Sequence, residues 1–391
     1  LKIKQNFDML GGSFFVDTDL GYMRYFGSNT YNQFTSVPIR IGYSQDLLGY
    51  NPFRWEKKIE PLKYEKVKKQ LIYNMEAVSE QATTYFFALA MADAKYKLAQ
   101  DIVASSDTLY RMGMQRHKIA AISQADLLTL KLDLVNARNT LQNIAISRKR
   151  AMFALASYLG MDKNTEIQLD LPGRPHEISI MVDKALNLAK ENNPSFLEWK
   201  QNVLEAQQAL DKAKKESRLN ASFDASVGYN QVADNLSDAY RRPMQQELVS
   251  VSFSIPLLDW GVSKGKRNMA HNNLEVVKTS SRQSELTLEE EVIMTVNDFN
   301  IQQSLIASAE EALDLSILAY NETRQRFVIG KTDINSLTLS LNRQQEAQQN
   351  YISALQNYWL NYYKIRKLTL HDFASGFSLS EKFDYNLNSR W

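Results

Sequence analysis

Apolar and polar residues alternate in four segments of the chain, and this period-two pattern predicts β-strands with one apolar and one polar face. Phe15 is the one apolar residue that falls on a polar face. Each predicted strand is about 9–11 residues long, which is the length that crosses a bilayer when a strand is tilted. The four apolar faces comprise Phe14, Val16, Leu20 and Tyr22; Val37, Ile39, Ile41 and Tyr43; Ala221, Phe223, Ala225, Val227 and Tyr229; and Val249, Val251, Phe253 and Ile255.

Aromatic residues gather near the strand ends, where membrane strands carry an interfacial girdle. The predicted membrane-interface aromatics are Tyr22, Tyr50, Trp55 and Trp260. A soluble hairpin packed on a helix shows the same alternation, so the pattern alone leaves both interpretations open. In the membrane interpretation, four strands cannot close a barrel, and lipid does not tolerate an open sheet edge. Several chains must then pool their strands, and three chains give about twelve, within the known range for such barrels.

A seven-residue repeat of apolar positions dominates the remaining sequence. It runs from Val292 to Phe327, and 210 residues earlier from Ala82 to His117. Sustained seven-residue spacing predicts coiled-coil packing. The two long helices expected at about 54–116 and 264–329 would each be a rod of roughly 90–100 Å at ~1.5 Å per residue. Shorter helices, at about 123–159 and 332–368, return along them.

The chain contains the same structural unit twice. Residues 37–50 align without gaps on residues 247–260, and Arg116–Ala120 aligns on Arg326–Gly330 at the same offset of 210 residues. Two matches at one offset indicate a duplication. Repeat 1 therefore spans 1–177, with strands at about 12–26 and 35–50, a tip at 117–123 and a belt segment at 161–177 that contains a strand candidate at 166–171. Repeat 2 spans 178–370, with an additional helix at 178–217, strands at about 220–232 and 247–258, and a tip at 327–337; a tail at 371–391 is expected near the belt.

Repeat 1 has only residues 1–7 at the place where repeat 2 has its additional helix. The counterpart of that helix is therefore expected to be missing.

The composition of the chain excludes several kinds of functional site. The 391 residues include 46 Lys and Arg against 44 Asp and Glu, so net charge gives no reason to expect nucleic acid as a partner. The absence of Cys excludes disulfides, thiolate metal sites and Cys nucleophiles. The four His lack ligand spacing, and residues 261–267 lack the spacing of a phosphate loop. The sequence therefore predicts no catalytic residue, no cofactor and no metal.

Strand pairs that feed two long helical hairpins in tandem resemble the TolC family of outer-membrane efflux proteins. The family's tip pattern is roughly aromatic-x-x-Gly-x-x-Ser/Thr-x-x-Asp-hydrophobic-Leu, and both His117–Leu128 and Phe327–Leu337 are similar to it. The corner at Pro256–Gly261 also looks like the family's turn from strand to long helix. The resemblance implies a mainly α protein with a membrane β-barrel portion. Its trimer would join a 12-stranded β-barrel to a 12-helix α-barrel.

The resemblance also implies a function and partners. A homotrimer would form the exit duct of a tripartite efflux or type I secretion system, in the Gram-negative outer membrane and extending into the periplasm. Its partners would be a periplasmic adaptor (membrane fusion) protein, an inner-membrane pump of the RND, ABC or a similar class, and outer-membrane lipid. Such a duct is not an enzyme. A soluble coiled-coil scaffold or interaction protein with a small β cap is the alternative.

Roles for the tip residues follow from the same resemblance. The pore constriction would comprise Asp126, Lys331, Asp333 and Asn335, with Asn335 at a position where the family often has an acidic residue. Docking of the adaptor would involve Arg116, Ala120, Ser123, Arg326, Gly330 and Thr332.

Overall fold

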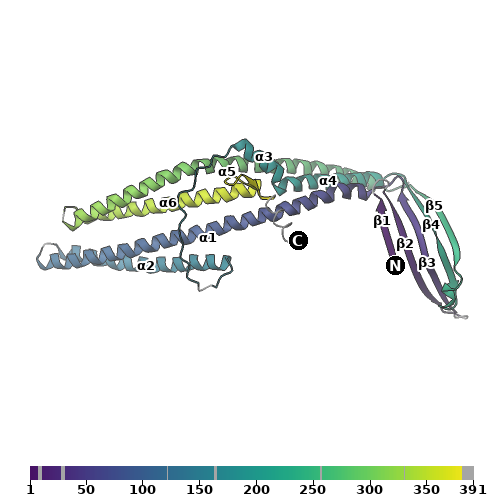
Figure 1. Ribbon diagram of the computed structural model, residues 1–391, viewed down its shortest axis with the longest axis horizontal. Coiled ribbons are helices and arrows are strands. Elements are labelled where there is room, and N and C mark those ends of the chain that lie inside the picture. The colour runs from purple at the N-terminus through teal and green to yellow at the C-terminus, as the bar shows by residue number, and fades with distance from the viewer. Residues whose placement is uncertain are drawn as a thin grey trace. The chain divides into compact units, whose positions relative to one another are not determined.

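The computed structural model describes residues 1–7, 11–27, 31–120, 122–162, 165–255, 258–329 and 331–380. The chain is mostly helical, with a set of antiparallel strands, as the sequence predicts (Figure 1). It divides into two compact units, one formed by 1–68 with 194–287 and the other by 69–193 with 288–391. The long helices α1 (Pro52–Lys118) and α5 (Val262–Val328) contribute to both units.

The first unit contains a sheet whose strands follow one another in sequence order, each antiparallel to its neighbours (Figure 1). The pairing of the third with the fourth strand joins the two repeats in one sheet. A short 3₁₀ helix, η1 (Asp238–Tyr240), lies in the last connection. The strands are β1 (Lys2–Phe7), β2 (Gly12–Tyr25), β3 (Tyr31–Asp46), β4 (Asn220–Ala233) and β5 (Met244–Ser254).

The described sheet has five strands, whereas the sequence pattern predicts four. The additional strand is β1, which pairs with Gly12–Asp17 at the edge of β2. Ile3 lies opposite Val16 and so shares its apolar face, whereas Lys2 lies opposite Asp17 on the polar face. A strand of 6 residues in which only Ile3 and Phe7 are apolar is too weak a pattern to detect locally.

Two features of the strands explain the irregularities of the alternation. The register of β3 shifts between Ser36 and Ile39, so Pro38, which has no N–H to donate, lies at a bulge. Phe15 lies on the polar face because its ring covers Gly42, and a Cβ at Gly42 would lie only 2.3 Å from that ring. Packing of an aromatic ring on a glycine of the neighbouring strand stabilises the sheet, which explains an apolar residue on the polar face.

The helix α4 (Pro194–Glu216) packs beside both long helices in the first unit. Ala206 and Leu210 of α4 form a small buried cluster with Leu274 of α5. On its other side, Asp211 accepts a hydrogen bond of 3.0 Å from the indole N–H of Trp55 in α1. The additional helix predicted at 178–217 is thus present, divided at Pro194 into α3 (Val182–Asn192) and α4.

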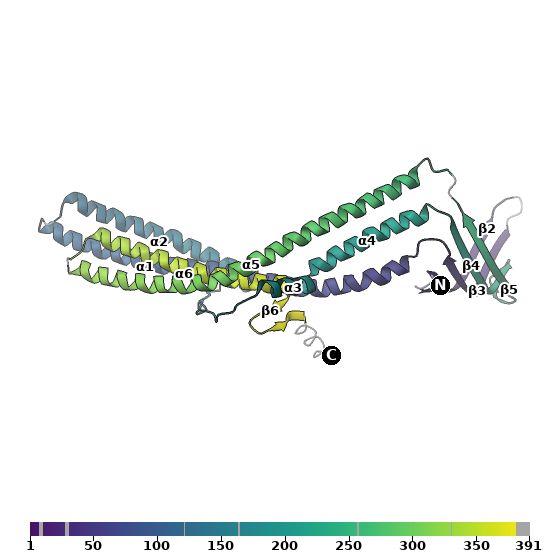
Figure 2. The ribbon, with the colours of Figure 1, turned by 90° about the horizontal axis from the view of Figure 1, so that it is seen from above.

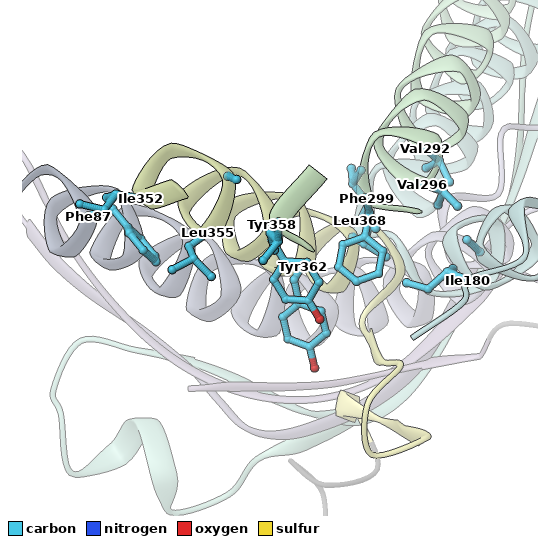
Figure 3. Packing of buried hydrophobic residues seen from close by; sticks show 14 of the residues in the cluster. Phe87, Ile180, Val292, Val296, Phe299, Ile352, Leu355, Tyr358, Tyr362 and Leu368 are labelled. Carbon is cyan, nitrogen blue, oxygen red and sulfur yellow. The ribbon is translucent and has the colours of Figure 1, made fainter. Parts of the chain in front are cut away.

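The heptad seam forms the main core of the second unit, where α2 (Gln124–Tyr158) and α6 (Ile334–Thr369) return along α1 and α5. Val292, Phe299 and Ile306 of α5 are each at most 2 % exposed. The ring of Phe299 packs against that of Tyr358 in α6, with the ring centroids 4.9 Å apart and the ring planes tilted by 35° (Figure 3). The burial that the seam predicts is therefore confirmed at these three positions. No helix within the described ranges is both long and apolar enough to cross a bilayer.

The segment between the repeats is not a strand at residues 166–171, where the sequence predicts one; it has no regular secondary structure (Figure 2). Its later part is held by two side chains of α5 instead of by a neighbouring strand. Gln303 exchanges two hydrogen bonds with the backbone of Ile178, at 2.8 and 2.6 Å, and Asn300 does the same with Ile180, at 3.2 and 2.9 Å. Side-chain amides thus satisfy the backbone groups that a sheet would otherwise satisfy.

A small hairpin follows α6. Its strands are β6 (His371–Asp372) and β7 (Phe377–Ser378), and α6 ends at Leu370 in a left-handed conformation, with φ of 48°. Residues 381–391 of the predicted tail lie outside the described residues.

Candidate functional site

The apolar face of the sheet is exposed. Ile41 is 48 %, Val251 is 51 % and Phe253 is 70 % exposed, although each is on the face that a soluble protein would bury. Aromatic rings of neighbouring strands lie close together on this face. The ring centroid of Tyr43 is 4.7 Å from that of Phe14 and 6.5 Å from that of Phe223. An apolar face that extends over several strands is far more than the scattered apolar residues of an ordinary surface. It requires either lipid or a protein partner.

The polar face of the same sheet carries charge. Arg40 of β3 donates to both carboxylate oxygens of Asp17 in β2, at 2.9 and 2.6 Å. The ammonium group of Lys2 lies 4.7 Å from the centre of the Phe15 ring on the same face. One face of the sheet is therefore apolar and the opposite face is charged, which is the arrangement of a strand between lipid and water.

The four predicted interface aromatics lie in different environments. Tyr22 is exposed on the apolar face and donates to Asn32 at 3.1 Å. Tyr50 accepts a hydrogen bond of 2.6 Å from Gln208 of α4, and Trp55 donates to Asp211 of the same helix. Trp260 is 86 % exposed, at the turn that leads into α5. The structure thus covers Tyr50 and Trp55 with α4 and leaves Trp260 uncovered.

The first hairpin tip is a tight turn that ends in a capped helix. Ala120 has a left-handed backbone with φ of 54°, and its N–H donates to the carbonyl of His117 at 2.9 Å. Ser123 caps α2 in a reciprocal arrangement with Asp126. The hydroxyl of Ser123, followed by its backbone N–H, holds the pKa of Asp126 below its ordinary value. Arg116 is exposed in the last turn of α1.

The second tip caps its return helix in a similar way. Asp333 accepts a hydrogen bond of 2.8 Å from the backbone N–H of Ser336. This N–H, followed by the Ser336 side chain, lowers the pKa of Asp333. Arg326 lies in the last turn of α5, and its carbonyl accepts a hydrogen bond of 2.8 Å from the backbone N–H of Lys331. Thr332 is half-buried and Asn335 is exposed, while Gly330 lies outside the described residues.

Two of the predicted constriction residues make local hydrogen bonds at helix starts of their own chain. Asp126 closes the capping box of Ser123 at the start of α2, Asp333 is the N-cap of α6, and both carboxylates are exposed. Within the described residues, no hydrogen bond or ion pair joins a polar residue of one tip to a polar residue of the other. Lys331 makes no described ion pair with Asp333. Ser-x-x-Asp at the first tip and an Asp directly before the helix at the second tip are both helix-start signals, so helix caps were to be expected at both tips.

Sequence reasoning missed a partly buried ionic cluster that joins the first repeat to the second, here called the clamp: Glu76, Glu80, Tyr362, Arg366, Lys367 and Asp372. Arg366 of α6 donates to Glu76 of α1 at 2.9 Å and lies 3.6 Å from Asp372. Lys367 pairs with Glu80 one turn further along α1, at 2.5 Å. Glu76 is only 7 % exposed, and a carboxylate is rarely buried to this extent unless it has a partner such as Arg366.

Burial and charge compete in the clamp. Burial acts to raise the pKa of Asp372, but the hydrogen bond from Tyr362 and the charge of Arg366 outweigh it, so the pKa of Asp372 is lowered. Burial, together with Asp372, raises the pKa of Tyr362. Each ionised group is thus stabilised by a partner of opposite charge or by a donor. No sequence motif indicates the clamp, because its central pair, Glu76 and Arg366, is 290 residues apart in the sequence.

The described residues contain no group of three or more His, Asp or Glu side chains placed to hold a metal ion.

Known protein families and solved structures are similar to this chain. Residues 185–369 match the family model described as outer membrane efflux protein. A sequence comparison with curated proteins gave no match.

Among solved structures, the outer membrane channel CmeC of Campylobacter jejuni is similar, with a TM-score of 0.72, 14 % identity, and coverage of 97 % of this chain and 81 % of that one. The outer membrane protein VceC of Vibrio cholerae has a TM-score of 0.69 at 14 % identity, with 93 % and 87 % covered. The open state of the Neisseria gonorrhoeae MtrE outer membrane channel has a TM-score of 0.67 at 14 % identity, with 90 % and 80 % covered.

These findings confirm the resemblance to the TolC family: the chain carries the outer membrane efflux protein domain and has the fold of the outer-membrane channels. Members of this family are channels without enzymatic activity, so the prediction that the chain is not an enzyme is confirmed.

Proposed function

We propose that the chain is one subunit of a homotrimeric duct in the Gram-negative outer membrane, which carries substrates of a tripartite efflux or type I secretion system out of the periplasm. The observation that carries the proposal is the sheet with an exposed apolar face and a charged face, continuous in sequence with two long helical hairpins. Lipid covers the first face and water fills the lumen beside the second. The hairpins then extend into the periplasm.

Exposed apolar residues on the helices support assembly of several copies. On α2, Leu128, Leu132 and Val135 recur at coiled-coil spacing and are 46–59 % exposed. On α5, Leu315 and Leu318 are 59 % and 65 % exposed. Such stripes favour further helices from neighbouring copies.

The strand directions restrict how a barrel can close. Because β1 and β5 run in the same direction, antiparallel closure pairs β5 of one copy with β2 of the next. Three copies of β2–β5 then give the proposed twelve strands. The β2 edge needed for this pairing is covered by β1 along Gly12–Asp17, so β1 must leave that edge when the ring closes.

The hairpin tips are the proposed contact with the periplasmic adaptor, through which an inner-membrane pump of the RND or ABC class supplies the energy. The exposed residues Arg116, Ala120 and Arg326 lie where each long helix ends. In a trimer, the tips would also place Asp126, Lys331, Asp333 and Asn335 near one axis. These polar groups are proposed to hold the resting pore closed.

Trimer formation and tip function can be tested separately. Outer-membrane fractions should yield a heat-modifiable trimer that conducts ions in planar bilayers. Ala120→Trp and Gly330→Trp should abolish export and adaptor binding while the trimer persists, whereas Ala104→Trp, at an exposed alanine of α1 away from the tip, should leave binding unchanged. Unchanged adaptor affinity in both tip variants would remove the tips as the docking surface.

The gate has its own test. Asp333→Ala combined with Asn335→Ala should raise single-channel conductance, and high salt should partly mimic the change because it screens charge. Normal conductance of the double variant at low and high salt would locate the gate elsewhere.

The alternative, a soluble scaffold with a β cap, makes the opposite prediction for fractionation. A soluble, sedimenting oligomer that never enters the membrane fraction would favour it. The exposed apolar strand face argues against it, because Ile41, Val251 and Phe253 on that face are 48–70 % exposed.

A further inference from the structure

The turn that leads into α5 differs from its counterpart in the first repeat. At the offset of 210 residues, Trp260 corresponds to Tyr50, and Lys264, Lys266 and Arg267 correspond to Arg54, Glu56 and Lys57. Tyr50 is covered by α4, since it accepts a hydrogen bond from Gln208 and has the ammonium group of Lys212 at 5.9 Å from its ring. Trp260 has no such cover and is 86 % exposed.

The backbone holds Trp260 in this exposed position. Trp260 has φ of 51°, a left-handed conformation that a bulky residue rarely adopts. Asp259 fixes the turn by accepting hydrogen bonds from the N–H groups of Gly261 and Ser263, at 3.1 and 2.9 Å. Leu258, on the other side of the turn, is 81 % exposed. Two large apolar side chains are thus presented to the outside just after Phe253 and Ile255 of the exposed strand face.

The charges that follow oppose the helix that carries them. Lys264, Lys266 and Arg267 lie in the first two turns of α5, where the helix dipole disfavours cations, and the first turn contains no acidic residue. None of the three forms an ion pair within the described residues. The first carboxylate of α5 is Glu275, which pairs with Lys278 at 2.8 Å. Three unpaired cations at the unfavourable end of a helix indicate an anionic partner from outside the chain.

A second copy of this chain does not supply those anions. The corresponding part of α1, residues 54–69, carries seven Lys and Arg against three Glu. The end of α4 carries Lys212, Lys214 and Lys215 against Asp211 and Glu216, and Asp211 already pairs with Lys215. Each helix is basic at this level, so neighbouring copies repel one another here and require the same counter-charge.

We infer that Trp260 with Lys264, Lys266 and Arg267 forms a binding site for the head group of an anionic phospholipid in the leaflet that faces the periplasm. The inference rests on the proposed membrane insertion of the strands. Trp inserts at the level of the head groups, beside the apolar strand face, and the cations attract the lipid phosphates. The site thereby fixes the depth at which the barrel ends and the helices begin.

The test uses the full-length trimer in phosphatidylcholine vesicles that contain the same small mole fraction of brominated phosphatidylglycerol or brominated phosphatidylcholine. Bromine quenches a nearby indole, and the part of the quenching that Trp260→Phe removes belongs to Trp260. The quenching of Trp260 should be on the order of fivefold stronger with brominated phosphatidylglycerol than with brominated phosphatidylcholine, as expected when even one basic side chain near the surface favours anionic lipid. The combined variant Lys264→Gln, Lys266→Gln, Arg267→Gln should lose the preference, and the control Lys278→Gln should keep it.

Two results would overturn the inference. Equal quenching of Trp260 by both lipids in the unaltered trimer would show that the cations do not recruit anionic lipid. An absence of quenching by either lipid would show that a neighbouring subunit covers Trp260. Retention of the trimer by the vesicles during an alkaline wash reports insertion independently, whether the pore is open or closed. Inserted trimers with either result would refute the lipid site while the proposed function stands, and trimers that the wash removes would refute the insertion on which the site rests.

Discussion

Exchanging neighbouring residues of β5 for arginine distinguishes a membrane strand from a soluble one. Val251 and Ser252 are both exposed in the isolated chain but lie on opposite faces of the sheet. Val251 is on the apolar face, beside Phe223 of β4, and Ser252 is on the polar face, beside Ser222. A soluble sheet would tolerate Val251→Arg and Ser252→Arg alike, each within about 0.5 kcal/mol, because both sites are exposed.

A lipid-covered sheet tolerates only the second exchange. Val251 lies two residues beyond Val249, the middle residue of the 11-residue strand β5. At ~3.4 Å per residue and a tilt of ~45°, this is about 5 Å from the midplane of an apolar band ~25 Å tall. A lipid-facing arginine costs ~2–4 kcal/mol at the midplane and ~0–1 near the interface, so Val251→Arg should cost about 2 kcal/mol per copy. Three copies then lose about 6 kcal/mol, which is comparable to the whole stability of many folded domains.

The assay is the yield of heat-modifiable trimer in the outer membrane, followed by urea unfolding of trimers refolded into vesicles. Val251→Arg should remove most of the trimer, and Ser252→Arg should retain it. Equal yield and equal urea midpoints for the two variants would refute the assignment of the apolar face to lipid.

Three further predictions concern the tip, the clamp and the sheet edge. Ala120→Gly should stabilise the first hairpin by about 1 kcal/mol, because it relieves a left-handed alanine; a lower thermal midpoint than that of the unaltered protein would contradict this. Arg366→Met should cost about 3–5 kcal/mol, more than Glu76→Met, since it leaves the buried Glu76 and the half-buried Asp372 without their cation. Because the pKa of Asp372 is lowered in the folded state, the contribution of the clamp to stability should be intact above the ordinary carboxyl pKa and lost as the pH falls through the lowered value. A free energy of unfolding that does not change over this pH range would contradict it. A disulfide between Ile3→Cys and Val16→Cys, which face each other in a chain without other cysteines, should block trimer formation until it is reduced, whereas unhindered assembly would show that β1 belongs to the closed barrel.

Local sequence determined the parts of this protein whose signal repeats at short range. Alternation in four segments gave the strands β2–β5, because a strand between two different environments needs a different residue type at every second position. The seven-residue seam through Val292, Phe299 and Ile306 likewise marked the side of α5 that became buried. The gapless match of residues 37–50 to 247–260 showed the duplication, and the TolC-family resemblance followed from the order of these elements.

Tertiary structure decided whatever depends on contacts between distant segments. β1 became a strand because the edge of β2 supplied backbone partners, although its own pattern is weak. Residues 178–180 stayed irregular because Asn300 and Gln303, some 120 residues away, satisfied their backbone groups. The family resemblance assigns Asp126 and Asp333 to a pore constriction, yet within one chain their carboxylates accept hydrogen bonds from Ser123 and Ser336 at the starts of α2 and α6. The clamp of Glu76 with Arg366 has no local signal, since the energy of a buried ion pair depends on burial and on a partner that only the fold brings into place.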